Sequence, residues 1–476
     1  MTKTHTIDFD SFFNIINGKK QSSATATHAI DSSSEGQLWE VPVATNEDIE
    51  SAVTAANDAF PSWSRTPVET RKELIAKFRD SYIFYLEQFI KLLMTETGKP
   101  HALAKGEVLE ILALFDHHLQ LQLPEEILED EERTITTRYV PVGVVAAICP
   151  WNFPMVLSVG KVLPALLSGC CIIVKPSPFT PYTALKIIEL AQYIFPPGVI
   201  QALGGSDSLG PALVSHPRIH KIAFTGSIAT GKKIMALAAG NLKRVTLELG
   251  GNDPAIVLPD VDIAKVAPEV AAGCFAFSGQ ICVATKRVYV HEAIYEPFLK
   301  AMVEATSKMK VGKPFDSDSV LGPLQNKMQY DRVRGFVDES KTQGHRFALG
   351  PDSATTGSGY FIHPSIIDNP PEDSKIVVEE QFGPIVPLLK WNDEADVIAR
   401  ANNSNTGLGA SVWGSDRAHA EDIGRQIEAG NVFINSSAKT TSRALFSGQK
   451  ESGIGGEWGS TGILHYCNAQ VMHVFK

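Results

Sequence analysis

The sequence is poor in several features that mark whole classes of protein. It has six cysteines in 476 residues, and no two of them form a CxxC pair, so their spacing indicates neither a zinc site nor a dithiol redox motif. Six scattered cysteines in so long a chain are typical of reduced thiols in a reducing compartment. Lysine and arginine together number 43 against 53 acidic residues. This excess of negative charge is opposite in sign to the basic surface that nucleic-acid-binding proteins usually have.

Long hydrophobic runs are also missing. The most apolar stretch, residues 156–174, is interrupted by Lys161, Pro164 and Gly169, which favours a buried helix and strand over a membrane span. A secretory signal has a basic region followed by an apolar one. The first thirteen residues lack this pattern. We therefore expect a cytoplasmic protein with neither a membrane nor a nucleic acid as partner.

The pattern that is present predicts an α/β protein of two or more domains. From Val142 onward, short apolar runs alternate with helical stretches, which is typical of a parallel sheet. The strands expected in this part are Val142–Ile148, Cys170–Val174, Val199–Leu203, Ile219–Phe224 and Val245–Leu247, with helices near 155–168, 181–194, 207–215 and 228–240. A second α/β passage is expected from about Pro254 to Phe446, with strands at Val288–Val290 and Ile385–Leu389, the latter weakened by Pro387.

Three short strings carry the residue types that carbonyl chemistry needs. Cys282 ends the string Phe275–Cys282 and supplies a thiol nucleophile, although a cysteine in an apolar run is more often a small buried hydrophobe. Asn152, in the turn Pro150–Pro154, can donate its amide to an oxyanion or simply cap a helix. Glu248, in Leu247–Gly251, is a general base if buried and a surface glutamate otherwise.

Other strings suit a phosphate-bearing cofactor. Lys175 ends a predicted strand, where ligands of open α/β sheets bind, although most lysines lie on the surface. The glycines of Gly226–Gly231 open a predicted helix and can present backbone N–H groups to a pyrophosphate. Their spacing differs from GxGxxG, and glycine-rich helix starts are common, so the signal is weak when taken alone.

In sequence order, these strings and Glu380-Gln381-Phe382-Gly383-Pro384 resemble the signatures of the NAD(P)-dependent aldehyde dehydrogenase superfamily. The resemblance runs from about residue 30 to the C-terminus. It implies that Cys282 forms a thiohemiacetal and then a thioester with an aldehyde, that Asn152 stabilises the oxyanion, and that Glu248 activates the hydrolytic water. It also links Lys161 to proton relay, with a structural role for Lys161 left open.

The resemblance implies NAD or NADP as cofactor and a Rossmann-like cofactor domain. The residues that it assigns to cofactor binding are Trp151, Lys175, Ser177, Pro178, Gly226, Ser227, Gly231, Leu249, Glu380 and Phe382. It assigns residues 1–118 and 142–249 to the cofactor-binding domain, 250–450 to the catalytic domain, and 119–141 with 451–476 to a small β oligomerisation element. The strand-like runs Thr134–Val140 and Val471–Phe475 predict a homodimer or homotetramer.

Several departures from the family pattern concern substrate choice. Phe277 stands where most members have asparagine, Gly456 where arginine is common, and Gly160 where some members place a bulky aromatic residue. The loop Phe446–Lys450 replaces the usual Phe-Gly-Gly. Pro178 stands where NAD-preferring members often have glutamate, so acceptance of NADP is expected.

Three alternatives stay open at this point. A CoA-acylating semialdehyde dehydrogenase would need no base at Glu248, and a non-enzymatic binding protein on the same scaffold would be expected to lose Cys282 or Glu248. A papain-like hydrolase would need a histidine partner for Cys282, and no histidine-bearing motif stands out.

Overall fold

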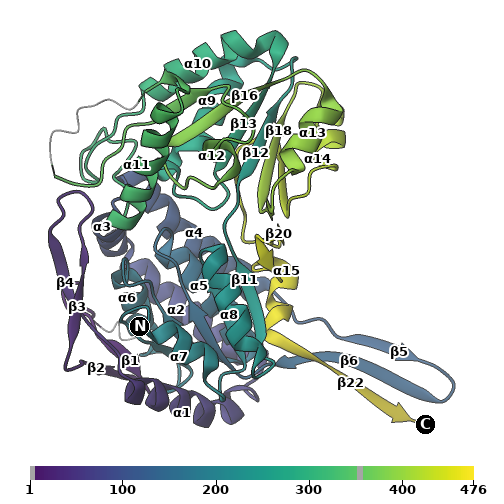
Figure 1. Cartoon of the computed structure of the whole chain (residues 1–476). Coiled ribbons are helices and arrows are strands. Elements are labelled where there is room, and N and C mark those ends of the chain that lie inside the picture. The colour runs from purple at the N-terminus through teal and green to yellow at the C-terminus, as the bar shows by residue number, and fades with distance from the viewer. Residues whose placement is uncertain (1–5, 351–357) are drawn as a thin grey trace.

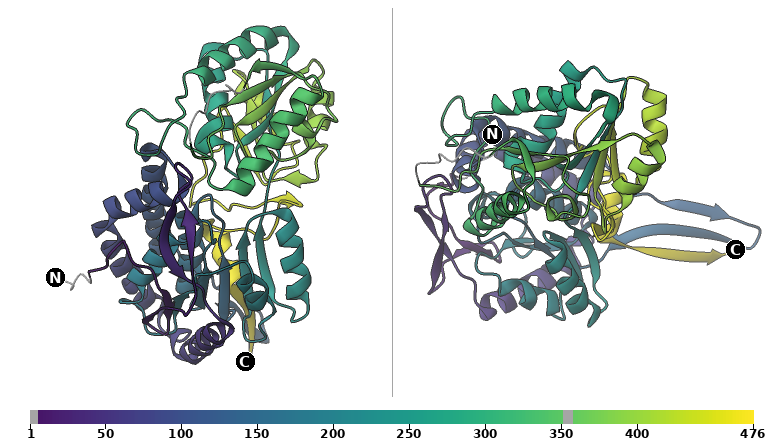
Figure 2. Two further views of the ribbon diagram at one scale, coloured as in Figure 1. Left: turned by 60° about the vertical axis from the view of Figure 1, so that its left-hand side comes forward. Right: turned by 45° about the horizontal axis from the view of Figure 1, so that its top comes forward.

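The computed structural model describes residues 6–350 and 358–476. It consists of two α/β units, with a three-stranded sheet that projects away from the first of them (Figure 1). Turned views show helices on both sides of each large sheet (Figure 2). The α/β class expected from the alternating pattern is confirmed.

The first unit is built on an eight-stranded sheet. Its order is β2 (Lys19–Gln21), β1 (Asn14–Ile16), β9 (Ile200–Ala202), β8 (Cys171–Lys175), β7 (Val144–Ile148), β10 (Lys221–Thr225), β11 (Arg244–Glu248) and β21 (Gly453–Ile454). The five strands from β9 to β11 are parallel and match the five predicted ones to within a few residues. β7 is buried along its whole length because helices cover both faces.

The order of the strands reverses at β7, so the sheet has a topological switch point there. β8 and β9 follow on one side of β7, and β10 and β11 lie on its other side. In open α/β sheets, ligands bind beyond the carboxyl ends of the strands at such a point. Here these ends carry Trp151 and Asn152 after β7 and Gly226 and Ser227 after β10.

The helices of the first unit are α1 (Asn46–Trp63), α2 (Val68–Phe84), α3 (Leu86–Thr97), α4 (His101–Gln120), α5 (Pro154–Ser168), α6 (Tyr182–Ala191), α7 (Leu209–Ser215), α8 (Ile228–Ala239) and the short α15 (Gly459–Gly462). α1 begins at a reciprocal capping box formed by Thr45 and Asp48. α2 and α3 are two separate helices that meet at Tyr85. Every residue of α5 is buried.

The second unit has a seven-stranded sheet. Its order is β14 (Arg346–Leu349), β15 (Ser365–Asp368), β16 (Ile385–Trp391), β13 (Thr285–His291), β12 (Asp253–Val257), β18 (Gly409–Trp413) and β19 (Asn431–Ile434), parallel except for β14. Pro387 lies inside β16, a central strand, although a proline there was expected to weaken it. Only β13 and β16 were predicted, because the other strands are short and bounded by Gly, Pro and Asp.

The helices of the second unit are α9 (Ile263–Phe275), α10 (Tyr295–Ser307), α11 (Lys327–Thr342), α12 (Lys375–Val378), α13 (Glu394–Asn402) and α14 (Arg417–Gly424). They enclose two hydrophobic clusters, one on each face of the sheet. Along β12, Ala255 and Val257 belong to one cluster and Ile256 to the other. Successive side chains of a strand point to opposite faces, so this alternation follows from the pleat of the strand.

The projecting sheet joins distant parts of the chain. β22 (Cys467–Phe475) pairs with β6 (Arg133–Pro141), which pairs in turn with β5 (Glu126–Glu129), all antiparallel. The two strand-like runs noted in the sequence, Thr134–Val140 and Val471–Phe475, thus pair with each other. The remaining strands form two small antiparallel sheets of two strands each. One pairs β3 (Ala26–Ile30) with β4 (Gln37–Pro42), and the other pairs β17 (Thr406–Gly407) with β20 (Gln449–Lys450).

Between residues 6 and 476, leaving out 351–357, no helix has both the length and the apolar character that crossing a membrane requires. In the same residues, no three His, Cys, Asp or Glu side chains gather so that they could hold a metal ion.

Candidate active site

Glu248 and Thr225 meet at the carboxyl edge of the first sheet. They end β11 and β10 and lie opposite each other in parallel register, and the Thr225 hydroxyl donates to Glu248 Oε2 at 2.9 Å. Glu248 is buried, and this burial outweighs the attraction of Lys161 and raises the carboxyl pKa to about 7. A carboxyl with such a pKa can accept and release a proton near neutral pH.

Cys282 enters the site on a tight turn of the second unit. The residues before it include Phe277, Ser278 and Gly279, which all have positive φ, at 50°, 53° and 76°. Only glycine fits the third of these positions, because a Cβ on Gly279 would lie 2.3 Å from the Gly383 carbonyl oxygen. Cys282 is the one cysteine of the six that is not buried, so a small reagent can reach it.

The turn brings the two predicted reactive groups together. Cys282 Sγ lies 3.3 Å from Glu248 Oε1 and donates to it. Burial, followed by the negative charge of Glu248, raises the pKa of the Cys282 thiol well above its usual range. The thiol is therefore protonated at rest, with a carboxylate in place to accept its proton.

A buried polar chain continues behind Glu248. Lys161 Nζ, on α5, donates to the Thr225 hydroxyl at 2.7 Å and to Glu457 Oε2 at 2.9 Å. All four side chains from Glu248 to Glu457 are buried. Because such groups lose their hydration, each depends on its neighbour for hydrogen bonds. Lys161 thus both fastens Glu457 to the sheet and lies two hydrogen bonds from Glu248.

Asn152 lies beside the cysteine turn. Its Nδ2 donates to the Gln280 carbonyl at 3.1 Å, which leaves the second amide hydrogen for another acceptor. The backbone of Asn152 is held by Lys99, whose Nζ donates to the Asn152 carbonyl at 2.7 Å and pairs with Glu107. Glu107 also accepts from the N–H groups of Met155 and Val156 at the start of α5.

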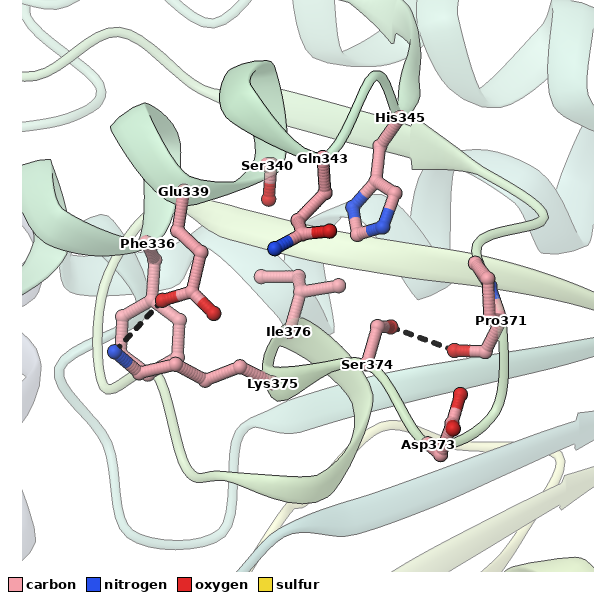
Figure 3. A pocket seen from close by; sticks show the side chains of 10 residues that line it. All are labelled: Phe336, Glu339, Ser340, Gln343, His345, Pro371, Asp373, Ser374, Lys375 and Ile376. Atoms are coloured by element: carbon pink, nitrogen blue, oxygen red, sulfur yellow. Dashed lines mark hydrogen bonds and ion pairs between the residues drawn. The ribbon is translucent and has the colours of Figure 1, made fainter.

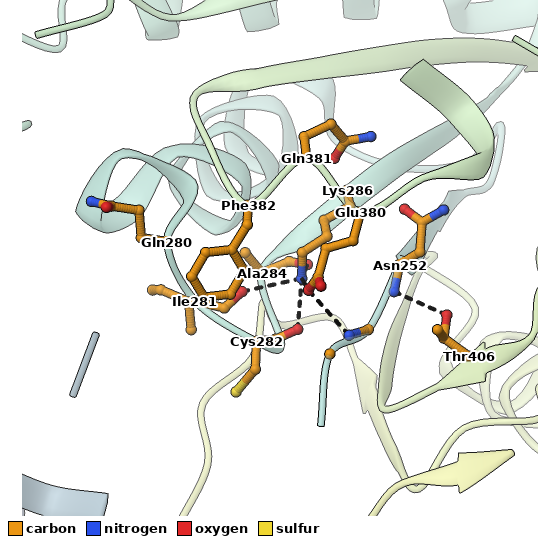
Figure 4. A network of polar contacts seen from close by, with 12 residues as sticks. Asn252, Gln280, Ile281, Cys282, Ala284, Lys286, Glu380, Gln381, Phe382 and Thr406 are labelled. Atoms are coloured by element: carbon orange, nitrogen blue, oxygen red, sulfur yellow. Dashed lines mark hydrogen bonds and ion pairs between the residues drawn. The ribbon is translucent and has the colours of Figure 1, made fainter. Parts of the chain in front are cut away.

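Glu380 and Phe382 lie on the other side of the cysteine turn (Figure 4). Glu380 Oε1 accepts from the Gly251 N–H at 3.1 Å and lies 3.4 Å from Lys286 Nζ. The ring of Phe382 meets the indole of Trp151 edge to face, with centroids 5.4 Å apart. These contacts bring three predicted cofactor residues to the junction of the two units.

Lys175, Ser177 and Pro178 lie at the end of β8, and their own contacts are local. Lys175 is buried and donates to the Pro176 carbonyl at 3.1 Å, and burial lowers the pKa of its ammonium. The Ser177 hydroxyl accepts from the Phe179 N–H at 3.2 Å. A buried ammonium with a single neutral acceptor has donors to spare for a ligand.

The start of α8 fits the predicted pyrophosphate site. Ser227 is the N-cap, its side chain accepts from the Thr230 N–H, and the first turn has no acidic residue. A Cβ on Gly231 would lie 2.6 Å from the Leu249 side chain. A glycine is therefore needed here for the helix to pack against the segment that follows Glu248.

Three of the departures from the family pattern lie in closely packed surroundings. The Phe277 ring lies 4.5 Å from Lys99 Nζ and meets Phe153 edge to face. A Cβ on Gly160 would lie 2.6 Å from the indole nitrogen of Trp458, so Trp458 occupies the space beside α5 that an aromatic residue at position 160 would need. Gly456 packs equally closely against Leu445.

A separate hollow lies between α11 and the segment before α12 (Figure 3). Its lining residues are Phe336, Glu339, Ser340, Gln343, His345, Pro371, Asp373, Ser374, Lys375 and Ile376. None of them is a predicted site residue. The ion pair between Lys375 and Glu339, at 2.9 Å, fastens α12 to α11 at this hollow.

Comparison with known proteins decides the family. The family model described as "Aldehyde dehydrogenase family" matches residues 19–472. The chain belongs to the aldehyde dehydrogenase family. It is accordingly an NAD(P)-dependent oxidoreductase of that class, as the sequence motifs predicted.

One relative and two solved structures illustrate the extent of the similarity. A putative aldehyde dehydrogenase of Gibberella fujikuroi is 43% identical over 471 residues, covering 99% of this chain and 100% of the relative. The NAD+ complex of an aldehyde dehydrogenase from Bacillus cereus is 34% identical, with a TM-score of 0.95 and coverage of 98% of this chain and 96% of that one. An NADP-dependent enzyme of E. coli is 31% identical, with a TM-score of 0.95, over 98% and 99% of the two chains.

Sequence reasoning missed several buried partners of the predicted aldehyde dehydrogenase site. They are Lys99, Glu107, Thr225, Asp253, Lys286 and Glu457. None lies in a string quoted above for its chemistry. Lysine and glutamate are almost never fully buried unless paired. Lys99 and Glu107 are eight residues apart, but the other partners are distant in sequence, so the sequence offered little local signal.

Proposed function

We propose that this chain oxidises an aldehyde to the carboxylic acid with NAD(P)+, through a thiohemiacetal and then a thioester on Cys282. The observation that carries the proposal is the 3.3 Å contact between Cys282 Sγ and Glu248 Oε1. A thiol beside a carboxylate with a pKa of about 7 has its base in place. The same contact favours hydrolysis of the thioester over its transfer to CoA, because transfer would leave Glu248 without a role.

The mechanism begins with transfer of the thiol proton to Glu248. Cys282 Sγ attacks the aldehyde carbon, the C–S bond forms, and the carbonyl oxygen becomes an oxyanion. The free amide hydrogen of Asn152 and the backbone N–H of Cys282 stabilise this charge. Such fixed donors are effective because they are already oriented before the charge develops.

The second half of the reaction resolves the thioester. Bound by the residues named in the next paragraph, NAD(P)+ would supply the acceptor for the hydride of the thiohemiacetal carbon. The thiol proton first leaves Glu248, which restores the carboxylate. Glu248 then takes a proton from water as the hydroxide oxygen bonds to the acyl carbon, the C–S bond breaks with Cys282 released as the thiolate, and the acid leaves. We assign the onward path of both protons to Thr225, Lys161 and Glu457, which continue from Glu248 by hydrogen bonds of 2.7 to 2.9 Å.

The chain's own residues fit a dinucleotide. Lys175 has unused donors at the end of β8, α8 opens on a capped turn without acidic residues, and Glu380 offers a carboxylate beside Gly251. We assign the adenosine ribose to Lys175, the pyrophosphate to Gly226–Gly231, and the nicotinamide ribose to Glu380. Trp151, Leu249 and Phe382 would flank the cofactor. The first α/β unit would then be the cofactor domain and the second the catalytic domain.

A substrate screen tests the proposed activity. Purified protein is incubated with NAD+ or NADP+ and a panel of aliphatic, aromatic and semialdehyde substrates, and reduced cofactor is followed by its absorbance. At least one aldehyde should give steady turnover and a stoichiometric amount of acid. Turnover that depends on added CoA and yields an acyl-CoA would contradict the hydrolytic function.

Cofactor choice is the first prediction. Pro178 has no carboxylate to repel a 2′-phosphate, and removing one such repulsion at close range is worth roughly 1 kcal/mol or more. The enzyme should therefore use NADP as well as NAD, and Pro178→Glu should selectively weaken NADP. The measurement is kcat/KM for both cofactors with one good aldehyde. Rejection of NADP by roughly a thousandfold in the wild type would show that Pro178 does not set the preference.

Self-association is the second prediction. The projecting sheet exposes apolar side chains on its outer strands, among them Leu128 at 66%, Val474 at 52% and Phe475 at 66%. Its two edge strands also have unpaired backbone groups. We expect a dimer or tetramer by light scattering at micromolar concentration, and a smaller species for the double variant Leu128→Asp/Val474→Asp. A monomeric mass for the wild type would contradict this.

A further inference from the structure

Lys286 is a buried lysine directly behind the cysteine turn. It is the second residue of β13 and is 2% exposed. Its side chain turns back toward the residues that precede the strand, and the ammonium lies between the turn and Glu380 (Figure 4). None of the roles proposed above for the aldehyde dehydrogenase reaction uses it.

The ammonium of Lys286 bonds to three backbone carbonyls of one turn. It donates to the Cys282 oxygen at 2.6 Å, to Ile281 at 3.1 Å and to Ala284 at 3.3 Å. A lysine ammonium has three N–H donors, so the backbone carbonyls of the turn that positions the cysteine can accept from all of them. The short bond to the Cys282 carbonyl ties the nucleophile's own peptide group to β13.

The same ammonium connects this turn to two other parts of the site. It lies 3.4 Å from Glu380 Oε1, and that oxygen also accepts from the N–H of Gly251, three residues after Glu248. Lys286 thus contacts the segment of the predicted nucleophile and the predicted ribose ligand, and Glu380 in turn contacts the segment that follows the predicted base. Removing Lys286 would take three backbone bonds from the Cys282 turn and the ion-pair partner from Glu380.

Charge gives Lys286 a second effect. The groups that act on the Cys282 thiol come from three strands and include two carboxylates that disfavour the thiolate, Glu248 on β11 and Asp253 on β12. Lys286 on β13 acts in the opposite sense and lowers the thiol pKa. Asp253 is itself buried, and burial raises its carboxyl pKa to about 7 despite the attraction of Lys286.

We propose that Lys286 is a positioning residue that holds the Cys282 turn against Glu380 and supplies the positive charge that favours the Cys282 thiolate. The inference rests on the proposed function, since it assigns Cys282 as the nucleophile and Glu380 as a cofactor ligand. It deepens that function by naming a residue that acts on the nucleophile through the backbone and through its charge. Arginine could keep the charge, whereas methionine would keep most of the volume and lose it.

The test is the rate of alkylation of Cys282 by iodoacetamide from about pH 6 to about pH 10, read by mass spectrometry of the Cys282 peptide, since the thiolate is the reactive form. Lys286→Met should raise the apparent thiol pKa by about one unit and slow alkylation near pH 8 about tenfold. Lys286→Arg should stay within about threefold of the wild type. Asp253→Asn should shift the apparent pKa in the opposite direction, because it removes a negative charge.

A matched control is available on the surface. Lys310 is exposed and pairs with the exposed Asp318, so Lys310→Met makes the same chemical change far from the site and should leave the alkylation profile unchanged. Equal profiles for Lys286→Met and the wild type would overturn the proposal. If Lys286→Met does not fold, as judged by circular dichroism, the alkylation profiles of Lys286→Arg and Asp253→Asn provide the test. Failure of Asp253→Asn to lower the apparent thiol pKa would then overturn the proposal.

Cofactor affinity gives a second readout that needs no turnover. With Lys286 removed, Glu380 loses its ion-pair partner, so the Kd for NAD+, measured by quenching of tryptophan fluorescence, should rise at least about threefold. Alkylation requires neither aldehyde nor cofactor. A wild type that oxidises no aldehyde would thus defeat the proposed function and leave the alkylation result standing, whereas active enzyme with unshifted alkylation would defeat the role of Lys286 alone.

Discussion

Replacement of Cys282 by alanine is expected to abolish aldehyde oxidation. The variant loses the sulfur that forms the covalent adduct, and no other cysteine can replace it because the remaining five are buried. Removal of an enzyme's nucleophile commonly costs roughly 10⁴-fold or more in kcat. The measurement is steady-state formation of reduced cofactor with the best aldehyde from the screen. Affinity for NAD+ should be unchanged, since Cys282 contributes no predicted cofactor contact.

The control for this variant is a second cysteine-to-alanine change. Cys274, on α9, is buried in a hydrophobic cluster of the second unit, and Cys274→Ala should retain nearly full activity. Substantial turnover by Cys282→Ala would refute its assignment as the nucleophile. Loss of activity in both variants, together with a lowered melting temperature, would indicate unfolding and call for Cys282→Ser as the replacement test.

Glu248→Gln is expected to separate the two halves of the reaction. The change removes the acceptor of the thiol proton, but it also removes the negative charge that raises the thiol pKa, so the thiol can still ionise to solvent, whereas the hydrolytic water has no other base. The variant should therefore give a burst of reduced cofactor close to one equivalent per site and then stall. General-base catalysis typically contributes roughly 10²- to 10⁴-fold, and the steady-state rate should fall within that range. Stopped-flow absorbance measures the burst, and mass spectrometry should find the acyl group on Cys282. Near-normal steady turnover would exclude Glu248 as the base.

The pH dependence follows from the same group. Burial raises the Glu248 pKa to about 7, and only the carboxylate can accept a proton from water. The rate of thioester hydrolysis in the wild type should therefore fall as the pH drops through about 7, and this limb should be absent from the residual rate of Glu248→Gln. Glu296→Gln, at an exposed residue that pairs with Lys390, is the matched control and should keep the wild-type profile.

The sequence by itself determined the fold class and the family, and it named the candidate reactive residues. Five parallel strands of the first sheet could be predicted because each is a short apolar run closed by turn residues. Cys282, Glu248 and Asn152 could be named because carbonyl chemistry restricts which residue types can stand in the turns beside strand ends, and such turns are local in sequence. The strands of the second sheet were mostly missed, because β12 begins with Asp253 and Pro254 and the others are as short as four residues.

Only the tertiary structure decided how these residues work together. The carboxyl of Glu248 has a pKa near neutrality because the fold buries it, and it meets Cys282 because two sheets from different units converge there. Lys161 and Glu457 are 296 residues apart, and from the sequence alone each would be placed on the surface as an ordinary charged residue. Burying a charge is costly unless a partner is within reach. No local stretch of sequence indicates that Lys161 pairs with Glu457 or that Lys286 pairs with Glu380. Only the folded chain brings these partners together.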